Sequence, residues 1–188
     1  GPTYTIASAN SGHQGTYTVQ AYNSLGSVQA SCYVTVGSSA PTGMVLIPGG
    51  TNSGTDPDFG AYSLTVNSFF MDRYEVTKAK WDEVYTWAIA NGYSFDHAGS
   101  GKAANHPVHT VNWYDVVKWC NARSQKEGRT PCYNLSTWAC DFAANGYRLP
   151  TNTEWAYAAR GGASNRRFPW GDRIDHTRAN YYAYWSGG

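Results

Sequence analysis

The stretch GYRLPTNTEWAYAARGG, residues 146–162, contains a helix together with the signals that begin and end it. Thr151 and Glu154 have the spacing of a capping box. In such a box the threonine hydroxyl accepts a hydrogen bond from the third helical amide, and the glutamate carboxylate accepts one from the backbone amide of the threonine. Gly161 can adopt the left-handed backbone that ends many helices. The stretch therefore predicts a helix that begins after Thr151 and ends before Gly161.

Two side chains of this predicted helix are also candidates for chemistry. Glu154 could act as an acid or a base, and Arg160 could bind an anion. We favour a cap for the first and a structural ion pair for the second, because the capping spacing already accounts for the glutamate. Trp155, Ala158 and Ala159 recur at i, i+3 and i+4, so we expect them to form the apolar face.

The bulk composition argues against two classes of function. A net charge of +1 and a charged fraction of 14% leave no basic surface that would gather nucleic acid. No run approaches the roughly 18 apolar residues that a membrane-spanning helix needs. Aromatic residues make up 15% of the chain and 20 residues are glycine, which is typical of loop-rich folds. We expect an extracellular, cell-surface or periplasmic location.

The segment VGSSAPTG, residues 36–43, divides the chain, because small residues and a proline are typical of a linker. We expect a β segment over residues 1–36, a linker over 37–42 and a second domain of mixed α and β structure over 43–188.

Residues 1–36 alternate apolar and polar side chains, which predicts a hairpin with its turn at NSLG, residues 23–26, and one further strand before it. Gly15, Tyr17 and Val19 form a pattern that resembles the tyrosine corner of immunoglobulin-like domains. The resemblance implies the last three strands of such a domain, which leave sheet edges exposed. We expect another chain, or copies of this one, to complete it.

The second domain is predicted to begin with short strands. MVLIP, residues 44–48, reads as a buried strand, and residues 62–76 alternate in the manner of a strand. Residues 50–61 and 93–105 are rich in glycine, aspartate and asparagine, and we expect both to be loops.

Two more capped helices are predicted, the first between Thr77 and Gly92 and the second between Asn112 and Gly128. Their apolar residues recur at i, i+3, i+4 and i+7, a spacing more typical of core than of a ligand site. These residues are Trp81, Val84, Tyr85 and Ala88 in the first helix, and Trp113, Val116, Val117 and Cys120 in the second.

Two groups of residues could bind a metal. His106 and His109 have H-x-x-H spacing, but Pro107 favours an extended backbone that points the two rings to opposite faces, so we expect no metal there. Asp56 and Asp58 could bind Ca²⁺ through loop oxygens, although a solvated turn is the favoured interpretation.

The four cysteines are Cys32, Cys120, Cys132 and Cys140. The last two flank a short predicted hairpin with its turn near Ser136, where a disulfide and two free thiols fit the sequence equally well. Neither Cys120, in a predicted helix, nor Cys32, in a predicted strand, has an evident partner. Because the chain has no C-x-x-C spacing, we expect no structural zinc site.

From Gly43 onward the chain resembles the formylglycine-generating enzyme, or sulfatase-modifying factor, family. Six stretches carry the resemblance in order: GMVLIPGG, VNSFFMDRYEVTKAKW, HPVHTVNWYDVVKWCNAR, GYRLPTNTEWAYAARGG, RRFPWGD and RANYY. The chain departs from the family's usual R-L-P-T-E-A-E-W-E-Y-A at Asn152, Thr153 and Ala156, which we expect on the helix surface. The resemblance implies a loop-rich α+β fold of the C-type-lectin-like class, in which the opening stretch is scaffold.

The family's reaction is the oxidation of a substrate cysteine to formylglycine by O₂. The cofactor is Cu⁺, which two active-site cysteines hold, and soft thiolates suit that ion. Those two cysteines follow the matched stretches, and none of the four in this chain corresponds to them. Cys120 corresponds to a structural cysteine whose family partner also has no counterpart in this chain. The resemblance therefore implies a domain truncated before its catalytic region, without catalytic or cofactor-binding residues, and we expect this chain by itself to be inactive.

The family also binds Ca²⁺ after its W-G-D segment, through an asparagine side chain and the carbonyl of the next residue. Asn180 and Tyr181 correspond to these two ligands, and oxygen ligands suit Ca²⁺. The implied metal site is partial, because the other ligands have no counterpart in this sequence. A turn asparagine beside a core tyrosine is the alternative.

Two functions stay open. One is an enzyme of this family, of which the chain supplies a part. The other is a non-catalytic, C-type-lectin-like recognition module of a secreted or surface protein, with a protein or peptide partner. The family's sulfoxide-forming branch, which uses non-haem iron, ranks last because no histidine triad is evident.

Overall fold

The computed structural model describes the following parts of the chain: residues 3, 5–6, 13, 15–34 and 40–179. The chain divides into two compact units, Gly1–Pro41 and Thr42–Gly188. None of the helices in the described part has both the length and the apolar character that a membrane crossing requires.

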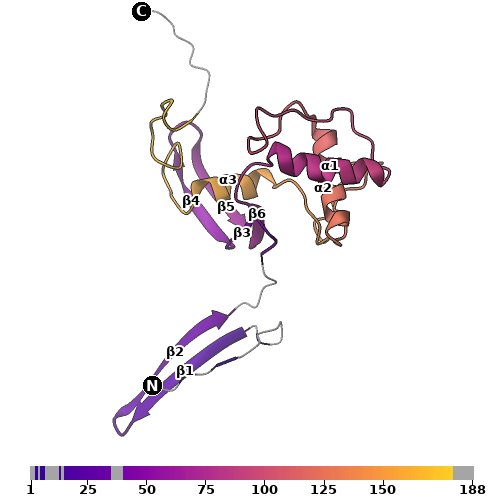
Figure 1. Ribbon diagram of the computed structural model, residues 1–188. Coiled ribbons are helices and arrows are strands. Elements are labelled where there is room, and N and C mark those ends of the chain that lie inside the picture. The colour runs from indigo at the N-terminus through magenta and orange to yellow at the C-terminus, as the bar shows by residue number, and fades with distance from the viewer. Residues whose placement is uncertain (1–2, 4, 7–12, 14, 35–39, 180–188) are drawn as a thin grey trace, which may run out of the picture. The chain divides into compact units, whose positions relative to one another are not determined.

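The strands and helices are labelled in Figure 1. In the first unit the structure contains β1 (Gly15–Asn23) and β2 (Gly26–Val34). In the described residues of the second unit the order is β3 (Met44–Ile47), β4 (Gly50–Asp56), β5 (Gly60–Val66), β6 (Phe69–Asp72), α1 (Lys78–Ala90), α2 (Trp113–Lys126) and α3 (Asn152–Arg160). Mixed helices and small sheets confirm the α+β class.

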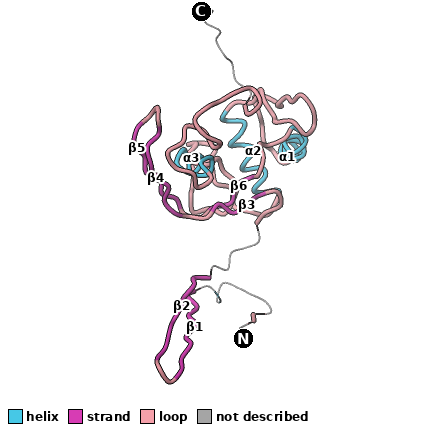
Figure 2. The backbone as a smooth tube through the Cα atoms, turned by 90° about the vertical axis from the view of Figure 1, so that its left-hand side faces the viewer, coloured by secondary structure: helices cyan, strands magenta, loops and turns pink. Residues whose placement is uncertain are grey.

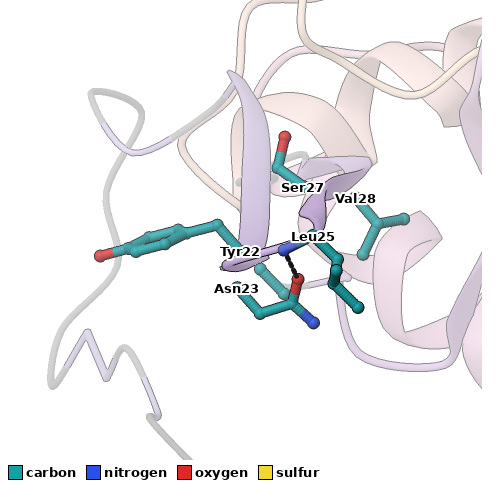
Figure 3. Close-up of a pocket in the computed structure, with 7 residues that line it drawn as sticks. Tyr22, Asn23, Leu25, Ser27 and Val28 are labelled. Carbon is teal, nitrogen blue, oxygen red and sulfur yellow. Dashed lines mark hydrogen bonds between the residues drawn. The ribbon is translucent and has the colours of Figure 1, made fainter.

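β1 and β2 form the predicted hairpin, with the register running from Gly15 opposite Val34 to Asn23 opposite Gly26. The side-chain oxygen of Asn23 accepts the amide of Leu25 at 2.9 Å and shapes the turn, as Figure 3 shows. The further strand predicted ahead of the hairpin falls largely outside the described residues.

The two faces of this hairpin differ in polarity. On one face the hydroxyls of Thr18 and Ser31 are 2.7 Å apart. The other face carries the apolar positions, and it is exposed: Val19 is 64% and Val28 is 70% accessible. The hairpin therefore has an apolar face without a covering layer among the described residues of its unit.

The second unit begins with two antiparallel strand pairs, β3 with β6 and β4 with β5. The loop predicted over residues 50–61 is wrong, because β4 and β5 form a hairpin there. β4 consists mainly of glycine, serine and threonine and shows no apolar alternation, and its ladder with β5 is supported by contacts such as that between the hydroxyls of Thr51 and Thr65 at 2.9 Å. The strand predicted over residues 62–76 is split between β5 and β6.

The helices take different places around these strands. Figures 1 and 2 show α3 beside the β4–β5 hairpin, with α1 and α2 together on the other side of α3. β3 forms as predicted, but Leu46 is 54% exposed, so this strand is not buried along its length. Residues 93–105 form no helix or named strand, as expected of a loop.

The core lies where α1 packs against α2. Thr77 and Asn112 cap these helices as predicted, and Asn112 also forms a capping box with Asp115. Trp81 and Trp119 are 1% and 2% exposed, and their rings stack with centroids 5.6 Å apart at an interplanar angle of 5°. The indole nitrogen of Trp119 also donates to the carbonyl of Trp81 at 3.1 Å.

Two tryptophans assigned to apolar helix faces lie on the surface instead. Trp113 is 45% exposed because it occupies the first turn of α2, whereas the fully buried part of that helix begins at Asp115. Trp155 is 63% exposed, and no residue of α3 is fully buried, because this short helix packs against β5 alone among the larger helix and strand contacts. The caps of α3 are confirmed: Thr151 and Glu154 form both capping-box bonds, and Gly161 has φ 55°.

A buried arginine joins β6 to α2. The guanidinium of Arg123, whose side chain is 5% exposed, donates to both carboxylate oxygens of Asp72 at 2.6 and 3.3 Å and to Glu127 at 3.2 Å. The central carbon of the guanidinium lies 3.9 Å from the ring centroid of Tyr147, whose hydroxyl donates to Glu127. Charge, stacking and hydrogen bonding thus converge on one side chain.

Candidate functional site

Three aromatic side chains gather on the surface of the second unit, and we call Trp113, Tyr114 and Trp138 the aromatic platform. Their ring centroids are 4.7 Å apart between Tyr114 and Trp138, 5.4 Å between Trp113 and Tyr114, and 6.2 Å between Trp113 and Trp138. The interplanar angles run from 64° to 83°, so the rings meet edge to face, as aromatic pairs prefer. Trp113 and Tyr114 are 45% and 46% exposed, unlike the core tryptophans.

The platform joins the first turn of α2 to a turn over residues 133–140. In that turn the side-chain oxygen of Asn134 accepts the amides of Ser136 and Thr137, an arrangement typical of asparagine in turns. Tyr133 and Cys140 pair at its base. Contacts within residues 133–140 therefore stabilise this turn, which carries Trp138.

Asn121, which is 3% exposed on α2, fastens the turn to the helix. Its side-chain nitrogen donates to the carbonyl of Tyr133 at 2.7 Å, and its side-chain oxygen accepts the amide of Tyr133 at 3.0 Å. The amide side chain thus fills both hydrogen-bonding positions that a neighbouring strand would occupy. Helix and turn are consequently held in one relative position.

Trp138 has a left-handed backbone, with φ 63°. For a bulky side chain this conformation costs about 1–3 kcal/mol and persists only where the surroundings enforce it. Here the conformation places the indole against Tyr114 and Trp113.

One cation borders the platform. The ammonium of Lys118, one turn along α2, lies 6.0 Å from the ring centroid of Trp138. It forms no ion pair with any residue that the structure describes. The platform therefore has an aromatic surface and an unneutralised positive charge at its side.

Asp115 anchors the helix end that carries the platform. Its buried carboxylate accepts hydrogen bonds from the ring nitrogen of His97 at 2.8 Å and from the backbone amides of Asp96 and Asn112 at 2.8 and 3.2 Å. Burial opposes ionisation, but the hydrogen bonds outweigh it and hold the pKa of Asp115 below its ordinary value. The carboxylate is thus committed to the cap and does not neutralise Lys118.

The exposure of Trp113 differs from its predicted place in the core, and the sequence pattern gives Tyr114 and Trp138 no role. One signal could have corrected this prediction: the cap at Asn112 places Trp113 at the first position of the helix, at its end.

The three cysteines of the second unit lie near enough to influence one another's ionisation. Burial raises the pKa of Cys120 to about 12, and burial also raises the pKa of Cys132 and of Cys140. Their thiols are therefore protonated at neutral pH, whereas nucleophilic attack and metal binding need the thiolate.

Of the two alternatives for Cys132 and Cys140, the structure shows free thiols. The register explains why: Cys140 pairs with Tyr133, and the carbonyl of Cys132 accepts the amide of Asp141 at 2.7 Å. Residues one position apart along a strand point to opposite faces, so the two thiols do not oppose each other.

Three of the four other metal candidates have protein partners in the structure. His106 and His109 are both exposed, and His109 instead contacts the hydroxyl of Thr110 at 2.8 Å. Asp56 pairs with Arg160 at 3.0 Å, and Asp58 pairs with Arg167 at 2.6 Å. Within the parts of the chain that the structure describes, no three His, Cys, Asp or Glu side chains gather where they could hold a metal ion.

The two charged residues of α3 have the structural roles that the sequence favoured. The guanidinium of Arg148 donates to both carboxylate oxygens of Glu154 at 2.7 Å, and this contact is the main reason that the pKa of Glu154 is lowered. Arg160 is paired with Asp56 and stacks 3.8 Å from the ring centroid of Tyr62. Asn180 and Tyr181, the predicted Ca²⁺ ligands, lie outside the described residues.

A pocket of about 360 Å³ at the tip of the β1–β2 hairpin offers no acid–base chemistry near neutral pH. Figure 3 shows the ring of Tyr22 extending away from Leu25 and Val28. The lining includes no carboxylate, imidazole, thiol or cationic group.

A sequence model of the sulfatase-modifying factor enzyme 1-like domain matches residues 33–188. The chain belongs to this family. The match begins at residue 33, within β2. The six stretches that carry the resemblance in the sequence begin later, at Gly43.

Three curated relatives are similar in sequence to this chain, which carries the sulfatase-modifying factor domain. The chaperone protein LppX of Paenibacillus barcinonensis is 30% identical over 156 residues, which cover 74% of this chain and 52% of the relative. The formylglycine-generating enzyme of Mus musculus is 28% identical over 199 residues, which cover 79% of this chain and 48% of the relative. The serine/threonine-protein kinase Pkn1 of Chlamydia trachomatis is 28% identical over 164 residues, which cover 76% and 23%. The chain spans about half the length of the first two.

Proposed function

We propose that this part of a sulfatase-modifying factor domain acts as a recognition module and does not oxidise cysteine by itself. The aromatic platform carries the proposal, because tryptophan and tyrosine dominate the binding energy of protein interfaces. Relatives named as a chaperone and as a kinase support it, since their names do not describe formylglycine formation. The expected partner is a protein or a peptide.

Cu⁺ is the cofactor that the family resemblance implies, and the described cysteines do not fit it. That ion is held by a pair of thiolates, whereas Cys132 and Cys140 do not oppose each other across their turn and Cys120 is buried in the core. Cys32 is exposed and belongs to the other unit. We assign none of these cysteines a role toward copper.

The purified chain, supplied with Cu⁺ and O₂, is therefore expected to leave a C-x-P-x-R peptide unchanged. Mass spectrometry of the peptide is the measurement, and an active formylglycine-generating enzyme is the positive control. Conversion of the peptide cysteine to an aldehyde by the purified chain would overturn the proposal.

The second candidate function is cysteine oxidation by a longer form of the protein. The family membership and the relatives named formylglycine-generating enzyme favour it. It requires a closely spaced cysteine pair that follows Gly188 in the longer form. Sequencing of the full coding region decides the point, because a coding region without such a pair leaves only the recognition module.

We propose finer folds for both units: C-type-lectin-like for the second and immunoglobulin-like for the first. The hydroxyl of Tyr17 donates to the carbonyl of His13 at 2.9 Å, a contact typical of the tyrosine corner. The exposed apolar face of the β1–β2 hairpin supports completion by another chain or by copies of this one. An experimental structure of a longer form would refute the immunoglobulin-like assignment if no second sheet covered the apolar face of the β1–β2 hairpin.

We also propose that Asn180 and Tyr181 contribute to a Ca²⁺ site, since a side-chain amide and a carbonyl are oxygen ligands. Added Ca²⁺ is then expected to raise the midpoint of thermal unfolding, because a ligand that binds only the folded state stabilises it. Asn180→Ala should abolish the rise. An equal rise in the variant would remove this site from consideration.

An extracellular, cell-surface or periplasmic location is proposed from the aromatic-rich, charge-poor composition. Detection of the protein in the cytosolic fraction alone of its source cells would contradict it.

A further inference from the structure

We propose that the aromatic platform and Lys118 bind a proline-rich peptide segment in the polyproline II conformation that carries an acidic residue. The inference rests on the proposed recognition function and names the chemistry of the partner. It concerns only the second unit and needs none of the cysteines.

The first argument is the exposure of the rings. A platform that served only to fasten the 133–140 turn to α2 would bury its aromatic surfaces, as the core does with Trp81 and Trp119. Trp138 is half-buried and meets that description. Trp113 and Tyr114 leave nearly half of their surface accessible, which fastening does not explain.

The second argument is the angle between the rings. Because the rings stand steeply to one another, the exposed parts of Trp113 and Tyr114 face different directions and do not form one flat surface. Proline-rich segments dock on aromatic surfaces of this kind because their conformation is already formed before binding. The angles of 83° between Trp113 and Tyr114 and 64° between Tyr114 and Trp138 provide this geometry.

The third argument is charge. Lys118 lies beside Trp138 without an ion pair to any described residue, and the nearby Asp115 is buried in the helix cap. An acidic residue in the peptide would complement the ammonium. The same charge disfavours a basic segment, so the C-x-P-x-R peptide of the family reaction is not the expected occupant.

Isothermal titration calorimetry with three short peptides tests the inference. The probes are Pro-Pro-Glu-Pro-Pro, its glutamine counterpart Pro-Pro-Gln-Pro-Pro, and Ala-Ala-Glu-Ala-Ala, each blocked at both ends. The first should bind most tightly. The glutamine peptide should bind about threefold to tenfold more weakly, and the alanine peptide should not bind measurably, because it lacks the preformed conformation.

Variants locate the binding. Trp138→Gly suits the left-handed backbone and removes the indole, so it should weaken binding of the acidic peptide about tenfold or more. Tyr114→Ala should act in the same direction. Lys118→Gln should weaken binding of the acidic peptide but not of the glutamine peptide. Trp155→Ala, which removes an exposed tryptophan on α3, is the matched control and should change nothing.

The outcomes separate cleanly. Absence of binding by the wild-type chain, equal binding of all three peptides, or equal loss in Trp155→Ala would overturn the inference. Binding of an oligosaccharide in place of the proline-rich peptides would overturn it as well. The aldehyde assay is independent of these titrations. If the chain forms no aldehyde and binds no peptide, the proposed ligand is wrong, but the proposal that the chain does not oxidise cysteine still stands. Circular dichroism confirms that each variant is folded.

Discussion

Arg123→Ala is expected to lower the free energy of unfolding by about 3–5 kcal/mol, the range for removing one partner of a buried ion pair. Asp72 and Glu127 would lose their shared cation, and the ring of Tyr147 would lose the guanidinium stacked upon it. Chemical denaturation followed by circular dichroism measures the change. Arg123→Lys should be intermediate, because an ammonium cannot form the two parallel bonds of a guanidinium.

Arg167→Ala provides the matched control. Arg167 also donates two hydrogen bonds to one carboxylate, that of Asp58, at 2.6 and 2.9 Å. Both side chains are substantially exposed, however, at 37% and 45%. Exposed pairs contribute little, so this variant should remain close to the wild type. Similar losses in the two variants would show that burial of Arg123 does not set its contribution.

Trp81→Ala is expected to cost about 3–5 kcal/mol, because it removes the largest fully buried side chain of α1 and leaves a cavity beside Trp119. It also leaves the carbonyl of Ala98 without the indole nitrogen that donates to it at 2.8 Å. Denaturant unfolding measures the loss. Trp81→Phe should recover part of the packing but not the hydrogen bond.

Trp155→Ala is again a suitable control, because it removes the same side chain from a surface position that is 63% exposed. A change within about 0.5 kcal/mol is expected for a surface substitution of this kind. If Trp81→Ala proved as mild as this control, the stacked tryptophan pair would not be the centre of the core.

The sequence allowed good prediction of the features that depend on short-range chemistry. Thr77, Asn112 and Thr151 cap helices because their side chains accept amides only three residues away. The turn at Asn23 is equally local. Such contacts are settled within a few residues and need no knowledge of the rest of the fold.

Features that depend on distant partners were harder to predict. β4 has no apolar alternation, so nothing in its own composition distinguishes it from a loop. Trp113 fits the spacing of the apolar stripe of α2. It lies in the first turn of the helix, however, and the core does not bury that turn at Trp113. The platform itself depends on a contact between Trp113 and Trp138, which are distant along the chain, and the left-handed backbone of Trp138 gives no signal in the sequence.

The side chain of Asn121 has a further consequence for any molecule that settles on the surface above it. By standing in for a missing strand, this one amide makes the start of α2 and the turn over residues 133–140 a single preorganised body. An incoming molecule would then meet a backbone that is already in place, so the receiving surface would lose less conformational entropy on association.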